Sequence, residues 1–436
     1  MIVIYSENIS NRLIYSLNVV FNHVLKTTFK IVNLETFDNS KNQVRVNYSS
    51  KNLKDCISII PHKILFETDI NKQKIKPKWI EDVPYFFKTC DNSLYGFDIF
   101  ASTFFMVSRY EEYFPKNLDN HYRFKAEDSF AFKNNFLELP VVNLWALNLK
   151  KEIANLYPDY NFPQTKYKYI NSIDIDIAYA YKGKGIFRLF AGFTKSVLTL
   201  NKSELKNRLK FILKKHDIYN SYDFINKIQE KYNTTNHYFI NLGDYAKFDK
   251  NLHHKTNSIQ QLIASLNLNN KNQIGIHPSY ASNKNPLKIG IEKKRLEKIT
   301  NQKITNSRQH FLMLSFPSTY ENLLKNNISH DYTMGYASKI GFRAGICSTF
   351  PFFNILKNEE EDLLITPFQI MDGTLNHYEK LKPEQAIKKI NKIINSIKKV
   401  NGSFVSLWHN SSLSETNDWE NWTIVYEKLV EEASKH

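Results

Sequence analysis

Tyr169-Ile-Asn-Ser-Ile-Asp174-Ile-Asp176 is an apolar run that stops at two carboxylates. Because alternate residues of a strand project to the same face, Asp174 and Asp176 are expected to share one side. Such a pair allows one carboxylate to bind a cation while the other acts as a base on the water that the cation activates. The stretch therefore predicts a strand with chemistry at its carboxyl end, and the alternative is that the carboxylates only cap the following turn.

Other apolar runs between residues 165 and 436 are interrupted in the same way by residues that can bind metal or move a proton. Ile274-Gly-Ile-His277 and Ser406-Leu-Trp-His409 end on histidine, and Ser307-Arg308-Gln-His310 begins a further run. A lone histidine beside a strand is more often structural, so the ordered combination carries the prediction. In parallel βα folds the carboxyl ends of the strands meet at one edge, where these side chains would share a cleft.

Strand-like and helix-like segments alternate after residue 165. The expected strands are residues 167–174, 237–242, 273–277, 310–315, 330–334, 365–371 and 403–408, and the expected helices include 222–232, 258–266, 319–326 and 383–400. Repeated βα units predict a parallel sheet, and about seven strands suit a barrel better than an open sheet. The expected fold class is thus α/β, with a barrel in residues 161–436.

Residues 1–160 are expected to form a separate, smaller α/β domain. Residues 2–5, 29–32 and 44–48 read as strands, and 97–114 and 141–156 show helical periodicity. Two prolines and a loss of periodicity in residues 157–163 mark the boundary. Within this part, residues 108–113 and 119–124 place charges beside aromatic rings, which indicates either a helix end packed on a loop or a contact with substrate.

Composition bounds the class of protein. The net charge of +16 permits an anionic partner, but the lysines are spread along the chain, so we expect no nucleic acid. The one dense basic stretch, residues 182–215, includes Phe187-Arg188-Leu189-Phe190 and predicts an amphipathic helix with a solvated face. The 3 cysteines show no paired spacing. We expect no membrane span and no secretory signal, and hence a cytoplasmic protein.

The motifs, taken in order, resemble those of NodB-homology polysaccharide deacetylases, carbohydrate esterase family four. The resemblance rests on Ser172-Ile-Asp174-Ile-Asp176, Ile276-His277-Pro-Ser279, Ser307-Arg308-Gln-His310-Phe, Asp331-Tyr332 and Leu407-Trp-His409. The chain is more closely similar to a bacterial group in which an uncharacterised N-terminal domain precedes the catalytic one. That likeness rests on residues 102–112, 242–249, 331–337 and 341–345.

The resemblance implies a distorted (β/α)₇ barrel and metal-dependent removal of N- or O-acetyl groups from sugars. The implied catalytic residues are the base Asp174, the acid His409 and the orienting Arg308. The implied metal ligands are Asp176 and His277, with Zn²⁺ as the expected ion. The expected substrate contacts are Leu407, Trp408, Asp331 and Arg343.

The resemblance implies an acetylated carbohydrate as substrate. Because a cytoplasmic protein would not reach polymeric wall material, an activated sugar precursor, such as a sugar nucleotide or a lipid-linked sugar, is the further hypothesis. The alternative is a catalytically inactive NodB-like domain that binds glycan. The sequence departs from the family pattern at Ile175, which separates the two carboxylates, and at Ala281, where the family has a second histidine.

A third metal ligand is therefore needed, because catalytic zinc sites generally take three from the protein. We predict that His310 replaces the missing one, since alternation puts it on the same face as Arg308. The alternatives are that His310 only hydrogen-bonds a loop, or that His330 or His377 serves instead.

Overall fold

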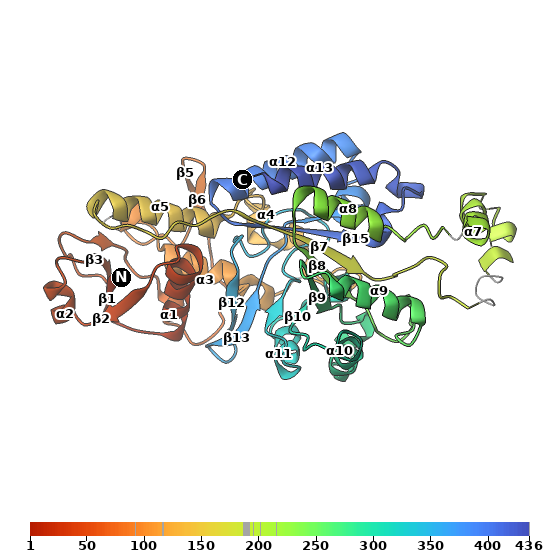
Figure 1. The fold of residues 1–436 in the computed structure, drawn as a ribbon. Helices are drawn as coiled ribbons and strands as arrows, with labels where there is room; N and C mark the ends of the chain where they lie inside the picture. Colours follow the sequence, from red (N-terminus) through yellow and green to blue (C-terminus); the bar gives the residue numbers. More distant parts are fainter. Residues whose placement is uncertain are drawn as a thin grey trace.

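The computed structural model describes residues 1–91, 93–115, 117–185, 192–194, 196–200, 202–214 and 216–435. The chain is a mixed α/β protein with a four-stranded sheet, a nine-stranded sheet and a two-stranded sheet. Figure 1 shows the four-stranded sheet at one end of the molecule and the nine-stranded sheet in its centre. The smallest sheet pairs β5 (Lys78–Ile80) with β6 (Val83–Tyr85).

The four-stranded sheet has the order β2-β1-β3-β4, and all its strands are parallel. They are β1 (Ile2–Ser6), β2 (Phe29–Val32), β3 (Val44–Tyr48) and β4 (Ile57–Ser58), so the three strands expected here are confirmed. The helices of this part are α1 (Asn11–Leu17), α2 (Leu34–Asn39), α3 (Ile99–Val107), α4 (Phe130–Lys133) and α5 (Val141–Leu156).

The helix expected over residues 97–114 is shorter than predicted. Asp98 caps its start by accepting from the backbone N–H groups of Phe100 and Ala101. The helix ends because Arg109 has a left-handed backbone with φ of +53°, and a separate 3₁₀ turn, η4 (Tyr110–Tyr113), follows. In this turn, the carboxylate of Glu112 accepts hydrogen bonds from Arg343, in the part of the chain that contains the nine-stranded sheet.

The nine-stranded sheet has the order β12-β13-β11-β10-β9-β8-β7-β15-β14, and only the pair β12-β13 is antiparallel. Its strands are β7 (Lys168–Ile175), β8 (Asn236–Ile240), β9 (Asn272–Ile276), β10 (Asn306–Ser307), β11 (His330–Asp331), β12 (Phe350–Asn354), β13 (Glu359–Ile365), β14 (Ile370–Met371) and β15 (Ser403–His409). The expected parallel sheet is thus present.

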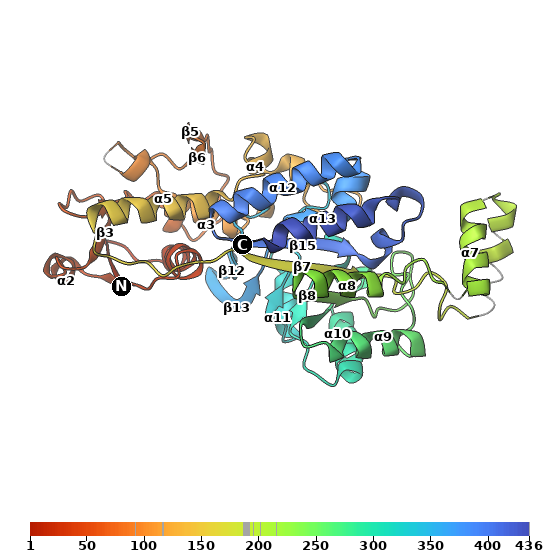
Figure 2. The same cartoon turned by 45° about the horizontal axis from the view of Figure 1, so that its top comes forward.

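Helices lie around the outside of these strands (Figure 1, Figure 2). They are α8 (Tyr222–Tyr232), α9 (Asn257–Leu268), α10 (Leu287–Thr300), α11 (Ser318–Lys325), α12 (Pro383–Lys399) and α13 (Trp422–Ser434). The four helices expected here are present, with ends that differ by at most a few residues. Their apolar faces pack on the sheet, as the buried Ile390, Ile393 and Ile397 of α12 illustrate.

The sheet curls so that distant strands meet across its inner face. The Arg308 guanidinium lies over the ring of Phe239 on β8 at 4.5 Å and over the ring of Phe368, between β13 and β14, at 5.7 Å. Among the described strands, the pairing runs from β12 to β14 without a pair that closes the ring. The register aligns the ends of β7, β8 and β9, because Ile175 pairs with Ile240 and Ile240 with Ile276.

The strand expected over residues 310–315 is wrong. Residues His310–Leu312 form a 3₁₀ turn, η7, after the two-residue strand β10. Phe311 and Leu312 have φ of +59° and +54°, and a left-handed backbone cannot continue an extended strand. The strand expected over 365–371 is not continuous either: Ile365 is the last residue of β13, residues 366–369 are in no strand, and only Ile370–Met371 form β14.

The basic stretch contains the expected amphipathic helix, α7 (Lys202–Lys214), whereas Phe187–Phe190 lies outside the described residues. Figure 1 and Figure 2 show α7 apart from the rest of the molecule, beyond the end of β7. Arg208 pairs with Glu204 and lies over the Tyr181 ring. Apolar side chains of α7, such as Ile212 and Leu213, are exposed as well as its lysines. In the described part of the chain, no helix has the length and apolar character needed to cross a membrane.

Candidate functional site

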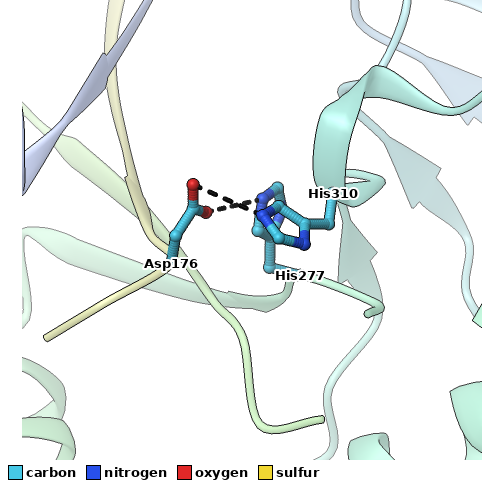
Figure 3. A group of neighbouring side chains, drawn as sticks. All are labelled: Asp176, His277 and His310. Carbon is cyan, nitrogen blue, oxygen red and sulfur yellow. Dashed lines mark ion pairs between the residues drawn. The ribbon is translucent and has the colours of Figure 1, made fainter. Parts of the chain in front are cut away.

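Asp176, His277 and His310 converge at the carboxyl edge of the nine-stranded sheet (Figure 3). Their ligand atoms all lie within 4.8 Å of one another. His277 Nε2 is 3.1 Å from Asp176 Oδ1, and His310 Nε2 is 3.4 Å from Asp176 Oδ2. Asp176 and His277 directly follow β7 and β9, and His310 begins η7. The chain therefore contains an Asp-His-His group that could hold a metal ion.

The hydrogen bonds of His277 fit a bound cation. Its Nδ1 lies 2.5 Å from the carbonyl oxygen of Arg308, and a carbonyl can only accept, so Nδ1 donates. Nε2 is then left to face Asp176. Asp176 Oδ1 is buried and has no hydrogen-bond partner among the described residues. A ring nitrogen and a carboxylate oxygen that face each other in this way suit a cation bound between them.

His310 is oriented in the same way by a carboxylate. Its Nδ1 lies 2.9 Å from Asp249 Oδ1, which leaves Nε2 to face Asp176. Carboxylate–histidine–metal arrangements of this kind are common in metalloproteins. Asp249 is itself fixed by the backbone N–H groups of Tyr280 and Ala281, at 2.8 and 3.2 Å. Ala281, where the resemblance led us to expect a second histidine, thus helps to fix the carboxylate that orients His310.

The charges in this group shift its pKa values. Burial lowers the pKa of His310, but the charges of Asp176 and Asp249 outweigh burial and raise it to about 9. Burial raises the pKa of Asp176, yet the neighbouring imidazoles, His310 foremost, bring it well below the usual range. In the absence of metal, the proton therefore resides on the histidine and not on the carboxylate.

Asp174 lies beside this group and is held by Arg308. Its Oδ1 accepts from Arg308 Nη1 at 2.8 Å, and its Oδ2 is 3.8 Å from His277 Nε2. Arg308 is fully buried and also donates through Nε to the carbonyl of Tyr332 at 3.0 Å. These contacts fix one oxygen of Asp174 and leave the other directed toward the metal group.

His409 approaches the metal group from the neighbouring strand, because β15 pairs with β7 and sets His409 opposite Asp174. Its Nε2 is 3.7 Å from Asp176 Oδ2, and its Nδ1 is 2.9 Å from Asp372 Oδ1. Burial lowers the pKa of His409, but the charges of Asp372, Asp176 and Asp174 raise it to about 10. The imidazole is therefore a proton donor at neutral pH.

Asp249 and Asp372 were not predicted. Asp372 follows the short strand β14, and its other oxygen accepts from the Ser412 hydroxyl and from the His409 backbone at 2.7 Å. The end of the expected strand 365–371 was an available signal for Asp372. Asp249 lies in a loop with no periodicity, and only the resemblance of residues 242–249 to the bacterial group pointed to it.

A cavity of about 160 Å³ joins these residues. Its walls contain the residues expected to bind metal or act in catalysis, other than Arg308, and Leu407. Arg123 and Tyr378 are among the other residues that line it. The cavity adjoins a hollow of about 220 Å³ with which it shares Arg123 and Tyr378.

The other three expected substrate contacts lie elsewhere. Trp408 packs against Trp422 and Tyr426, with ring centroids 6.3 and 5.1 Å away, on the opposite face of β15 from Leu407. Asp331 is buried and accepts from Ser307 and Thr333, and it does not line the cavity. Burial raises the pKa of Asp331 to about 6.

Arg343, the remaining expected contact, lines the adjoining hollow. Its Nη2 and Nε donate to the two carboxylate oxygens of Glu112 at 2.5 and 2.9 Å. Its charge is thus committed to a carboxylate of the N-terminal part, and a substrate would have to compete with that carboxylate.

Fold and site together define a mixed α/β protein with an Asp-His-His group at the carboxyl edge of a largely parallel sheet. Residues 2–158 match a family of unknown function (DUF7033). No curated protein matches the chain. The chain is similar to a crystal structure described as a "putative polysaccharide deacetylase" from Mycobacterium smegmatis, with 11% identity, a TM-score of 0.39, and coverage of 63% of this chain and 86% of that one.

Proposed function

We propose that this protein is a metal-dependent deacetylase that hydrolyses N- or O-acetyl groups of a carbohydrate, with residues 161–436 as a NodB-like (β/α)₇ barrel. The observation that carries the proposal is the placement of Asp174 and His409 beside the group of Asp176, His277 and His310 in one cavity. A base, an acid and three ligand atoms within one small space are the requirements of metal-assisted hydrolysis.

Asp176, His277 and His310 would hold the divalent ion, with a position left for water. Two imidazoles and one carboxylate suit Zn²⁺, which commonly takes this set in catalytic sites. When bound, the ion supplies Lewis acidity toward the acetyl carbonyl and lowers the pKa of the attacking water. The Arg308 carbonyl behind His277 and Asp249 behind His310 keep the two imidazole ligands in place.

Asp174 is the proposed base. Its free oxygen takes the proton of the attacking water, whose oxygen forms a bond to the acetyl carbon, and Arg308 keeps the carboxylate in place. Its other oxygen accepts from the Arg308 guanidinium, so the free oxygen keeps one direction.

His409 is the proposed acid. It donates its Nε2 proton to the sugar nitrogen or oxygen as the bond to the acetyl carbon breaks, and acetate is released. Asp372 holds the other ring nitrogen and stabilises the imidazolium. Leu407 lines the same cavity and offers an apolar surface to the acetyl methyl group.

The substrate is proposed to be an acetylated carbohydrate or an activated sugar precursor. Acetate release should be measured on acetylated sugars and sugar nucleotides, before and after removal of metal with a chelator and after addition of Zn²⁺. We expect release that stops with the chelator and returns with the metal. Tight metal binding without any release of acetate would contradict the proposal and favour the inactive glycan-binding domain.

A further inference from the structure

The turn that carries His310 has an unusual backbone. The two residues after His310, Phe311 and Leu312, both have a left-handed backbone, although neither is glycine. Side chains disfavour this conformation, so consecutive residues keep it only where the surroundings hold them. The position of His310 therefore depends on whatever fixes this turn.

Arg123 contacts the turn from the N-terminal part of the chain. Its Nη1 donates to the carbonyl oxygen of Phe311 at 2.7 Å. Its Nε donates to Asp119 Oδ2 at 2.7 Å, and its Nη2 donates to the Tyr378 hydroxyl at 3.3 Å. Arg123 is 8% exposed, so these bonds form where water competes little. A planar guanidinium with all three nitrogens engaged is a rigid support.

A second residue of the same loop, His121, contacts the Phe311 ring. His121 lies 4.8 Å from it between ring centroids, and Tyr280 and Phe248 lie 5.2 and 5.5 Å away. Asp119 ties the loop together, because its Oδ1 accepts from the backbone N–H groups of His121 and Arg123 at 2.8 and 2.9 Å. Residues 119–123 thus hold both the carbonyl and the ring of one residue.

We propose that the loop of residues 119–123 positions His310 for metal binding by holding the left-handed turn, with Arg123 as the positioning residue. The segment matched by the family of unknown function then forms part of the metal centre instead of an independent module. This inference rests on the metal site of the proposed function but not on the reaction, so it can be tested without a substrate.

The first test measures the affinity for Zn²⁺ by competition with a chromophoric chelator. Arg123→Gln should weaken it by about 10- to 100-fold, the usual effect of losing a residue that supports a metal ligand. Arg45→Gln is the matched control, because Arg45 is also buried in the N-terminal part and donates to the carbonyls of Lys54 and Asp55. The control should keep the affinity of the wild type, and equal affinities in all three proteins would overturn the inference.

The second test measures amide hydrogen exchange in residues 309–314 of the metal-free full-length protein. Exchange there should be faster in Arg123→Gln than in the wild type and unchanged in Arg45→Gln. If Arg123→Gln does not fold, Arg123→Lys retains the charge beside Asp119 but loses the planar set of bonds, and it should show the same two effects. Unchanged exchange in a folded Arg123 variant overturns the inference.

The outcomes separate this inference from the proposed function. Weaker Zn²⁺ binding in the Arg123 variant, with no acetate release from the wild type, would support the positioning role and contradict the deacetylase. A wild-type protein that binds no Zn²⁺ would overturn both. Acetate release from the wild type, with unchanged metal affinity and exchange in the variant, would overturn the positioning role alone.

Discussion

The capacity of Asp176, His277 and His310 to hold a metal ion depends on which ring nitrogen of each histidine carries a proton. His277 and His310 both commit Nδ1 to an acceptor, the carbonyl of Arg308 and the carboxylate of Asp249. Both Nε2 atoms therefore face Asp176. Without a cation, a proton can take this place, and the charges of Asp176 and Asp249 raise the pKa of His310 to about 9 against the effect of burial.

Metal uptake should release a proton. In the metal-free protein the pKa of His310 is raised to about 9, so the ring is charged at pH 7, and a metal must displace that proton. The affinity for Zn²⁺ should fall by about tenfold for each pH unit below 9 and level off above it. Calorimetry in two buffers with different ionisation enthalpies measures the released proton. An affinity that does not change between pH 6 and pH 8 would contradict this prediction.

Removing the charge of Asp174 and removing that of Asp176 should have different effects on turnover and on metal content. Asp174→Asn should abolish turnover and leave the metal content near that of the wild type, because Asp174 stands beside the ligand group without belonging to it. Asp176→Asn should lose the metal, because it removes the charged ligand. Metal analysis of the purified variants tests both statements. A loss of metal in Asp174→Asn equal to that in Asp176→Asn would show that the roles are misassigned.

The candidate metal ligands could be predicted from the sequence, but the residues that hydrogen-bond to the histidines and orient them could not. Asp176 and His277 could be chosen because each lies at the end of an apolar run, and His310 because alternation puts it on the same face as Arg308. Asp249 and Asp372 act only through tertiary hydrogen bonds, so periodicity contains no signal for the first and a weak one for the second. Arg123 lies far before the ligand that it supports in the chain, so no local pattern connects the two.

Alternation along β15 puts Leu407 and Trp408 on opposite faces of the strand, although the resemblance implied that both contact the substrate. Leu407 faces the cavity, whereas Trp408 faces α13 and contacts Trp422 and Tyr426. Successive side chains of a strand point to opposite faces, so only one of the two can line the site. Applied to residues 407 and 408, this rule favours Leu407, which shares its face with His409.

Substitutions on the two faces of β15 should differ in effect: one should lower stability alone, and the other should also weaken substrate binding. Trp408→Ala should lower the free energy of unfolding by about 3–5 kcal/mol, the usual cost of removing a buried tryptophan, and leave KM unchanged in the protein that remains folded. Leu407→Ala should raise KM for the acetylated substrate in addition to its cost in stability. Denaturant titration and steady-state kinetics test the pair. A raised KM in Trp408→Ala would return Trp408 to the substrate pocket.

The helices were easier to predict than the turn at His310. Their periodic apolar residues are a local signal, and α8 (Tyr222–Tyr232) and α5 (Val141–Leu156) have the predicted ends. The left-handed turn at Phe311 and Leu312 has no such signal, because neither residue is glycine or asparagine. The conformation is imposed by contacts with residues distant in the chain, which a single sequence does not reveal.

At the scale of the whole molecule, one hydrophobic core contains residues from both the four-stranded and the nine-stranded sheet. Backbone bonds also join the two parts, since Val142 N–H donates to the Gly345 carbonyl and Phe342 N–H to the Leu137 carbonyl. Gly341 has φ of +125° and lies against Leu137, where a side chain would collide with the Leu137 carbonyl. The domain boundary near residue 160 stays a prediction. Because these contacts cross it, the stability of each part alone is the property to measure.

Glu112 is a buried charged link between the two parts. It accepts from Arg343 and, at 2.8 Å, from Arg109 Nε, and all three side chains are buried. Burial raises the pKa of Glu112, but Arg343 and Arg109 outweigh burial and lower it. A lowered pKa in the folded state stabilises the protein above the unfolded pKa, and this stabilisation is lost as the pH falls through the folded value.

Glu112→Gln should therefore lower the free energy of unfolding at pH 7 by about 3–5 kcal/mol, because it leaves the buried Arg343 guanidinium without a carboxylate. Arg109 also loses Glu112 but keeps its pair with Glu111 at 3.0 Å. Glu127→Gln is the matched control, since Glu127 pairs with Lys339 across the same two parts at 3.7 Å, with side chains 47% and 32% exposed. An exposed pair of this kind should contribute about 0–1 kcal/mol. Denaturant titration of both variants gives the comparison.

Residues 161–436 alone should be less stable than the full chain. Without the N-terminal part, Arg343 loses its carboxylate, the turn at Phe311 loses Arg123, and apolar surface of the shared core meets water. The fragment should unfold at lower denaturant than the full chain or fail to fold cooperatively. Two results together would instead show that each part folds around a core of its own. They are a fragment as stable as the full chain, and a Glu112→Gln variant whose free energy of unfolding is no lower than that of Glu127→Gln.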